Sequence, residues 1–254
     1  MLGGVRTVTT LSGERDVQAA WALELDPDRS LTVNVLSSLS ASPSRVPRED
    51  ELFLWFGAPA EDEPTVSLDT LQPDERTRST SFSQTSDQWN YVAARRGLRI
   101  LVGAALGCAP GDVALARGAH GKPSLDARFH GSACAARVEF SVSHTRDLVA
   151  VALSGRTVGI DVEAREAEHL NYMAIARRAF APEAFAELCA IGDVGERLKR
   201  FFEIWTMGEA FVKATGQGLA QGMGGFAFTR GAVGLARASP PWGPASRWRF
   251  GLVS

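Results

Sequence analysis

Two acidic side chains share one face of a predicted strand. Within Val158–Glu163, Asp161 and Glu163 alternate with Ile160 and Val162, and alternate residues of a strand point to the same side. Neighbouring carboxylates repel each other unless a cation lies between them. Oxygen ligands suit Mg²⁺ or Mn²⁺. This short pattern is common, so on its own it fits a solvated edge strand as well as a metal site.

A glutamate and a lysine lie one turn apart on a helix predicted from about residue 195 to Thr215. Glu209 and Lys213 are four positions apart and so share a helix face. An exposed ion pair of this kind contributes only about 0.2–0.5 kcal/mol. Aromatic residues at Phe202 and Trp205 indicate instead that the helix is buried, and a buried charge pair needs a reason. We therefore interpret Glu209 as a third metal ligand and Lys213 as a contact for a phosphate that the metal bridges.

Two turns carry further polar groups. A predicted strand ends at Ser143-His144, where a hydroxyl, an imidazole and turn amides can hold a phosphate. A Ser–His catalytic pair is disfavoured, because adjacent strand residues point in opposite directions. Lys122, in Gly121-Lys122-Pro123, could contact a phosphate or a base. Taken alone, His144 fits an ordinary histidine in a turn, and Lys122 fits a lysine in a surface turn.

Helices and strands occur in both halves of the chain, which favours an α+β fold of two similar lobes over a doubly wound sheet. We expect the lobes to span residues 49–150 and 151–254. Residues 1–48 are poorly patterned and are expected to form a variable or partly mobile extension, with a short strand near Leu31–Leu36. The predicted strands are Leu52–Phe56, Val138–Val142, Leu148–Leu153, Thr157–Val162, Phe226–Thr229 and Trp248–Leu252, and the predicted helices are Tyr172–Phe180, Pro182–Ala190, one starting at Pro73, one from an Asp87 N-cap to a Gly107 stop, and the helix ending at Thr215.

Composition excludes several classes of protein. The chain has 254 residues, of which 45% are hydrophobic, and a net charge of −2. This balance argues against a general nucleic-acid or membrane-surface binder. Three widely spaced cysteines favour a reducing compartment over a disulfide framework or a zinc site. Neither a signal peptide nor a membrane span is visible, so we expect a cytoplasmic protein.

In this order, the motifs resemble the surfactin-type family of 4′-phosphopantetheinyl transferases. The combination of Gly-Ile-Asp-x-Glu with Trp-x-x-x-Glu-x-x-x-Lys some 40–50 residues later is far more specific than either string alone. The resemblance covers roughly residues 52–230 and is carried by Gly121–Pro123, Phe140–His144, Val158–Glu163, Trp205–Lys213 and Gly216–Leu219.

The resemblance implies two pseudo-symmetric α+β lobes with coenzyme A bound between them. The serine of an acyl- or peptidyl-carrier protein would attack the β-phosphate, take up phosphopantetheine and release 3′,5′-ADP. Asp161, Glu163 and Glu209 would hold Mg²⁺ (or Mn²⁺), which offsets charge on the diphosphate. Glu209, or a metal-bound water beside it, would be the base. Two lobes in one chain could form a complete site, so a monomer is the simplest expectation.

The remaining roles also follow from motif position. Lys213 would hold the reacting phosphate, Ser143 and His144 would contact coenzyme A phosphates, and Lys122 would lie near the adenine or the 3′-phosphate. Arg95, in a segment that resembles the helix of the first lobe, would be a further coenzyme A contact.

The sequence departs from the family pattern at three places. Gly208 replaces the usual lysine before the helix glutamate, and it puts a residue about 1 kcal/mol less favourable than Ala inside the helix. Ser81-Phe82 replaces the usual Arg-Phe before the first-lobe helix, which removes a phosphate contact. One more strand is expected beyond Ser254.

Two other functions stay open, the first of them because of these departures. One is a catalytically weak module that binds coenzyme A or a carrier protein. The other is a metal-dependent diphosphate hydrolase that uses water in place of serine, which is disfavoured because no helix of clustered glutamates is present.

Overall fold

A computed structural model describes residues 17–58, 68–118, 120–146, 148–165, 170–218 and 222–253. The chain forms two compact units, divided after Asp28 and after Val158. We call Arg29–Val158 the central unit and the remainder the terminal unit. The predicted α+β fold of two lobes is confirmed, but the chain divides differently from the predicted boundaries.

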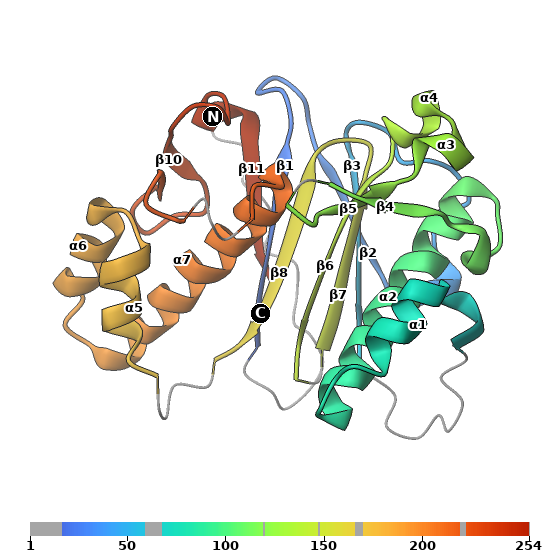
Figure 1. The fold of residues 1–254 in the computed structure, drawn as a ribbon. Helices are drawn as coiled ribbons and strands as arrows, with labels where there is room; N and C mark the ends of the chain where they lie inside the picture. The colour runs from blue at the N-terminus through green and yellow to red at the C-terminus, as the bar shows by residue number, and fades with distance from the viewer. Residues whose placement is uncertain are drawn as a thin grey trace. The chain divides into compact units, whose positions relative to one another are not determined.

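The central unit is built on a four-stranded sheet with the order β2-β3-β7-β6. Strands β2 and β3 are parallel and the other neighbours are antiparallel. One face of the sheet is covered by α2 (Figure 1), whose Leu98, Leu101 and Val102 are buried with Phe140 and Val151. The strands are β2 (Thr32–Leu36), β3 (Glu51–Gly57), β6 (Glu139–Thr145) and β7 (Leu148–Ser154), and α2 spans Thr85–Leu106.

Both ends of α2 follow local chemistry. Gly107 closes the helix in the left-handed conformation, with φ of 69°, so the predicted stop is confirmed. The predicted N-cap is wrong: Gln84 holds that position, and Asp87 lies in the first turn. A carboxylate there still interacts favourably with the helix dipole.

Shorter elements complete the central unit. Helix α1 starts at Pro73, as predicted, and its Glu75 completes a capping box with Gln72. These shorter elements are α1 (Pro73–Ser79), β4 (Leu115–Arg117), β5 (Pro123–Leu125), α3 (Ala127–His130), α4 (Ser132–Ala135) and the 3-10 turns Leu39–Ala41, Leu68–Thr70 and Pro110–Asp112.

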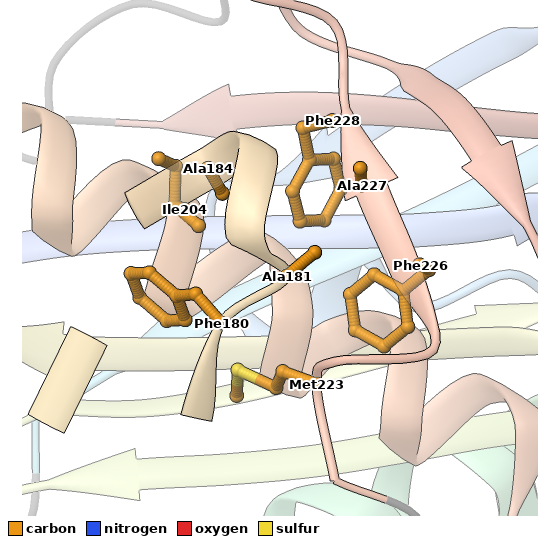
Figure 2. Close-up of a pocket in the computed structure, with 8 residues that line it drawn as sticks. All are labelled: Phe180, Ala181, Ala184, Ile204, Met223, Phe226, Ala227 and Phe228. Carbon is orange, nitrogen blue, oxygen red and sulfur yellow. The ribbon is translucent and has the colours of Figure 1, made fainter. Parts of the chain in front are cut away.

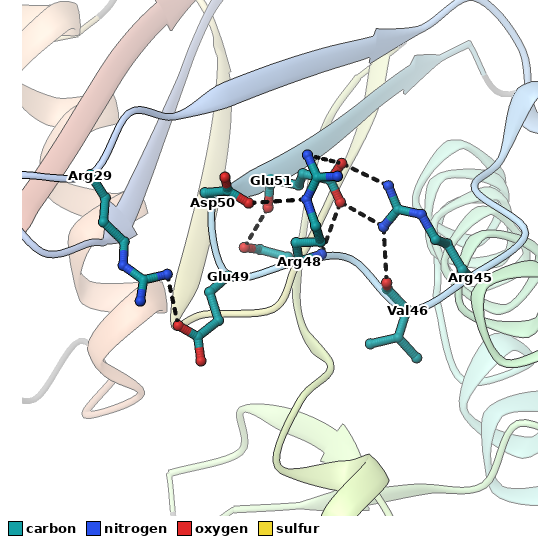
Figure 3. Close-up of polar contacts among 8 residues, drawn as sticks. Arg29, Arg45, Val46, Arg48, Glu49, Asp50 and Glu51 are labelled. Carbon is teal, nitrogen blue, oxygen red and sulfur yellow. Dashed lines mark hydrogen bonds and ion pairs between the residues drawn. The ribbon is translucent and has the colours of Figure 1, made fainter.

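A cluster of charges fastens the loop before β3 (Figure 3). Glu51 is buried and accepts two hydrogen bonds from the Arg45 guanidinium at 2.7 and 2.8 Å. It also accepts one from the Arg48 backbone at 2.9 Å. Glu49 pairs with Arg29 at 3.1 Å. The loop is therefore held mainly through one buried carboxylate.

The terminal unit contains a three-stranded sheet with the order β11-β1-β8. Helix α7 packs against β1, and Phe211 lies in the core with Trp248 and Phe250. The elements are β1 (Val17–Glu24), β8 (Val158–Ala164), α5 (Tyr172–Ala179), α6 (Pro182–Ala190), α7 (Val194–Thr215), β9 (Phe226–Phe228), β10 (Leu235–Ala238), the 3-10 turn Ala245–Arg247 and β11 (Trp248–Val253).

Strand β1 differs most from the sequence expectation. Residues 17–24 fall in the segment predicted to be an extension, yet they form the middle strand of a sheet, with Ala19–Leu23 fully buried. Alanine has a low strand preference, so this alanine-rich run gave no strand signal. Strand β1 pairs with β11, and the further strand expected after residue 254 stays a prediction.

Candidate active site

Glycine at position 159 sets the distance between β8 and α7 in the terminal unit. A Cβ atom at Gly159 would overlap the carbonyl oxygen of Ala210 and lie 2.5 Å from the nitrogen of Ala214. Only glycine permits this approach of strand backbone to helix backbone. As a result, the acidic end of β8 lies beside the turn of α7 that carries Glu209 and Lys213.

Asp161 and Lys213 form a direct ion pair across this contact. The Lys213 ammonium donates to Oδ1 of Asp161 at 2.6 Å. Asp161 is only 3% exposed, whereas about a third of the lysine side chain is accessible. The ion pair is thus reached from solvent through the lysine.

Glu163 is oriented by a tryptophan. The indole Nε1 of Trp205 donates to Oε1 of Glu163 at 3.0 Å. Burial raises the pKa of Glu163, and the charge of Asp161 raises it further, against the Trp205 hydrogen bond and the Lys213 charge. The effect of the Asp161 charge on Glu163 is consistent with the predicted position of both carboxylates on one face of the strand.

Glu209 is a buried carboxylate that is not fully hydrogen-bonded. It is 8% exposed, and within the described part of the chain its Oε1 atom has no hydrogen-bond partner. Burial raises its pKa to about 7, helped by the charges of Asp161 and Glu163 and opposed by Lys213. A carboxylate with this pKa is half protonated near neutral pH, which suits a general base.

Asp161, Glu163 and Glu209 are a candidate metal site. Among the residues described, no group of three His, Cys, Asp or Glu side chains is already arranged to hold a metal ion. The donor set nevertheless fits a hard cation, because it is entirely oxygen. The raised pKa values of Glu163 and Glu209 and the unpartnered Oε1 of Glu209 indicate that Lys213 alone does not balance the negative charge.

Gly208 faces the core. A Cβ atom there would lie 2.8 Å from the Met223 sulfur. Met223 belongs to a small apolar cavity (Figure 2), so a lysine at position 208 would have to displace the Met223 side chain. The cavity is lined by Phe180, Ala181, Ala184, Ile204, Met223, Phe226, Ala227 and Phe228.

The other predicted contacts belong to the central unit. Ser143 is buried and His144 is exposed, so these neighbours point in opposite directions, as expected. The Lys122 ammonium lies 3.1 Å from Oε2 of Glu139. Roles for these three residues in ligand binding stay predictions.

Arg95 occupies an internal charge cluster. Its guanidinium lies 5.4 Å from the centre of the Tyr91 ring and 3.8 Å from Glu75. Glu75 in turn pairs with the fully buried Arg99 at 2.7 Å. These contacts give Arg95 a structural role, and its role as a coenzyme A contact stays a prediction.

Comparisons with known proteins agree along the chain. A family model described as "4'-phosphopantetheinyl transferase, N-terminal" matches residues 55–156, and one described as "4'-phosphopantetheinyl transferase superfamily" matches residues 157–250. The 4'-phosphopantetheinyl transferase HetI of Nostoc sp. is 34% identical over 189 residues, which cover 72% of this chain and 76% of that protein.

Two more relatives are matched over a smaller part. A putative 4'-phosphopantetheinyl transferase of Synechocystis sp. is 30% identical, over 60% of each chain. The 4'-phosphopantetheinyl transferase Sfp of Bacillus subtilis is 25% identical, over 59% of this chain and 62% of its own. Within the described residues, no helix is long and apolar enough to cross a membrane.

Proposed function

The chain belongs to the 4′-phosphopantetheinyl transferase superfamily, and from this membership we infer that it transfers 4′-phosphopantetheine from coenzyme A to a serine of an acyl- or peptidyl-carrier protein. The observation that carries the assignment of residues is the cluster at β8 and α7. There, Asp161, Glu163 and Glu209 carry negative charge that the positive charge of Lys213 only partly balances.

Glu209 is proposed as the base. Without a bound cation the pKa of Glu209 is about 7; this carboxylate, or a water beside it, would accept the proton of the carrier serine. The serine oxygen then forms a bond to the β-phosphorus, and the bond from that phosphorus to the oxygen bridging the α-phosphate breaks. The leaving group is 3′,5′-ADP.

Lys213 is proposed to hold the reacting phosphate while it stays paired with Asp161. The ammonium donates a hydrogen bond to Asp161. The partial exposure of the lysine side chain leaves it accessible to a ligand. Charge that develops on the phosphate would be stabilised by this donor.

Asp161, Glu163 and Glu209 are proposed to hold Mg²⁺, with Mn²⁺ as an alternative. When bound, the ion would neutralise charge on the diphosphate. Trp205 supports this role for Glu163, because its hydrogen bond to Oε1 leaves Oε2 for other interactions. Ser143, His144, Lys122 and Arg95 are proposed as further coenzyme A contacts on the basis of motif position.

Within the superfamily we propose the surfactin type. The match of two consecutive family models to one chain supports this, although HetI is more similar to this chain than Sfp is.

The test is intact-protein mass spectrometry of an apo carrier protein incubated with this protein, coenzyme A and Mg²⁺. A mass gain of one phosphopantetheine, lost with EDTA and with Asp161→Ala, is expected. Release of 3′,5′-ADP without a carrier protein would indicate a hydrolase instead. Binding of coenzyme A without any transfer to several carriers would indicate the binding module.

A further inference from the structure

One polar side chain in the core of the central unit is not explained by packing. Asn90, in the first part of α2, is 3% exposed. Its Nδ2 donates to the carbonyl oxygen of Arg146 at 3.0 Å, 56 residues further along the chain. Its Oδ1 is buried, and the described residues offer it no hydrogen-bond partner. Buried polar groups without partners are rare in native proteins and call for an explanation.

The Asn90 hydrogen bond reaches the tip of the β6–β7 hairpin. Thr145 pairs with Leu148, so Arg146 is the first residue of the turn between them. Among the described residues, β6 is at the edge of the sheet and has β7 as its one neighbouring strand. An edge hairpin tip is a place where local opening is easy. The Asn90 amide therefore ties this tip to α2, two residues from His144.

We propose that Asn90 is a positioning residue for coenzyme A binding; this rests on the function proposed above. By holding the carbonyl of Arg146, its amide fixes the hairpin tip so that the exposed side chain of His144 faces the phosphates of coenzyme A. Asn90 does not touch the reacting atoms. It acts through the backbone of the hairpin tip and through His144.

The unpartnered Oδ1 atom of Asn90 distinguishes a positioning role from a purely structural one, because it lowers stability. The carboxamide provides one hydrogen bond, which stabilises by about 0.5–1.5 kcal/mol, but its buried Oδ1 costs about 1–3 kcal/mol. A leucine of similar size would avoid this cost. Retention of a destabilising group is typical of residues that serve function.

Asn90→Leu is the main test. We expect urea unfolding to give a midpoint equal to or above that of the unsubstituted protein, since both the bond and the unpartnered oxygen are removed. The KM for coenzyme A and its Kd by calorimetry should rise about tenfold, because misplaced contacts weaken binding, and kcat should change less than twofold. In a His144→Ala background, the same substitution should change Kd by less than twofold, because the two residues act together.

Thr70→Val is the matched control. The Thr70 hydroxyl is also buried without a hydrogen-bond partner among the described residues, and it belongs to the turn Leu68–Thr70 of the central unit and not to the hairpin. This substitution should leave the KM for coenzyme A unchanged.

The outcomes of these measurements distinguish a positioning role of Asn90 from a purely structural one. A lower unfolding midpoint for Asn90→Leu with an unchanged Kd overturns the inference and makes Asn90 a structural tie, while the proposed transfer reaction stands. A raised Kd that persists in full in the His144→Ala background also overturns it. If the unsubstituted protein does not bind coenzyme A, both proposals fail. If the unsubstituted protein binds coenzyme A without transferring phosphopantetheine, the proposed function fails, and the Kd for coenzyme A alone tests the role of Asn90.

Discussion

Lys213 on α7 and Asp161 on β8 are joined by a hydrogen bond of 2.6 Å, although they lie 52 residues apart in the chain. The contact places one ammonium among three carboxylates, two of which have raised pKa values. The lysine thereby lowers the repulsion within the cluster without removing it. This balance determines what substitutions here should do.

Lys213→Met keeps the length of the side chain and removes its charge. Because the Lys213 charge lowers the pKa of both Glu163 and Glu209, both values should rise. Carboxyl ¹³C NMR titration would detect the shift, and the transfer rate should fall by about a hundredfold or more. Lys199→Met, at an exposed position of the same helix, is the control and should change neither quantity. An unchanged Glu209 titration would contradict this account.

Glu209→Gln should separate activity from stability. Loss of the base should lower turnover by about a thousandfold. The folded-state pKa of Glu209 is raised from 4.5 to about 7, so ionisation of this group destabilises the metal-free fold as pH rises from 4.5 through 7. Removing the charge should therefore stabilise the protein at pH 8, by on the order of 2 kcal/mol, and change little at pH 4.5.

The measurement for Glu209 is urea unfolding at both pH values in the presence of EDTA. Glu203→Gln is the matched control, because Glu203 lies on the same helix and pairs with Arg200 at 3.0 Å. It should show no gain in stability at pH 8. Destabilisation by Glu209→Gln at pH 8 would mean that the carboxylate is better satisfied than the structure indicates.

Much of the fold could be predicted from sequence because it follows from local periodicity, whereas the grouping of the acidic residues with Lys213 was expected from the resemblance of the motifs to a known family. Helix α6 and the end of α7 at Thr215 agree with prediction to the residue, and Asp161 and Lys213 are brought together. Three features depend on distant partners and could not be predicted. Strand β1 is recognisable only once β11 and β8 lie on either side of it.

The other two features are single side-chain contacts. The Trp205 bond to Glu163 and the Asn90 bond to Arg146 span 42 and 56 residues, and nothing local specifies either. Gly159 did offer a signal, since glycine inside a strand often marks a close backbone approach. That signal could have predicted that α7 crosses β8 next to Asp161.

Gly208→Lys tests whether the missing lysine can simply be restored. Position 208 is buried against Met223, so a lysine would have to bury its stem and displace a core side chain. We expect a loss of about 1–3 kcal/mol in the free energy of unfolding and no increase in transfer rate. Gly208→Ala, the smaller change, gains about 1 kcal/mol of helix propensity and displaces only the flexible end of Met223. A faster Gly208→Lys enzyme of normal stability would show that the glycine is a handicap.

Glu51 should make the central unit sensitive to acid. The Arg45 hydrogen bonds, against the effect of burial and with help from the Arg48 backbone, lower its pKa from 4.5 to about 2. Because the folded-state pKa is depressed, the stabilisation is present above pH 4.5 and is lost as pH falls towards 2. Glu51→Gln should therefore lower the free energy of unfolding at pH 7 by about 1–2 kcal/mol, a value reduced because the side chains of Arg45 and Arg48 are more than half exposed. The difference should disappear near pH 2 in urea unfolding curves.

The control for this prediction is Glu49→Gln, at a carboxylate that is itself half exposed. This substitution should cost no more than about 0.5 kcal/mol in the free energy of unfolding. Equal losses for the two variants at pH 7 would show that burial of Glu51 adds nothing to its ion pairs.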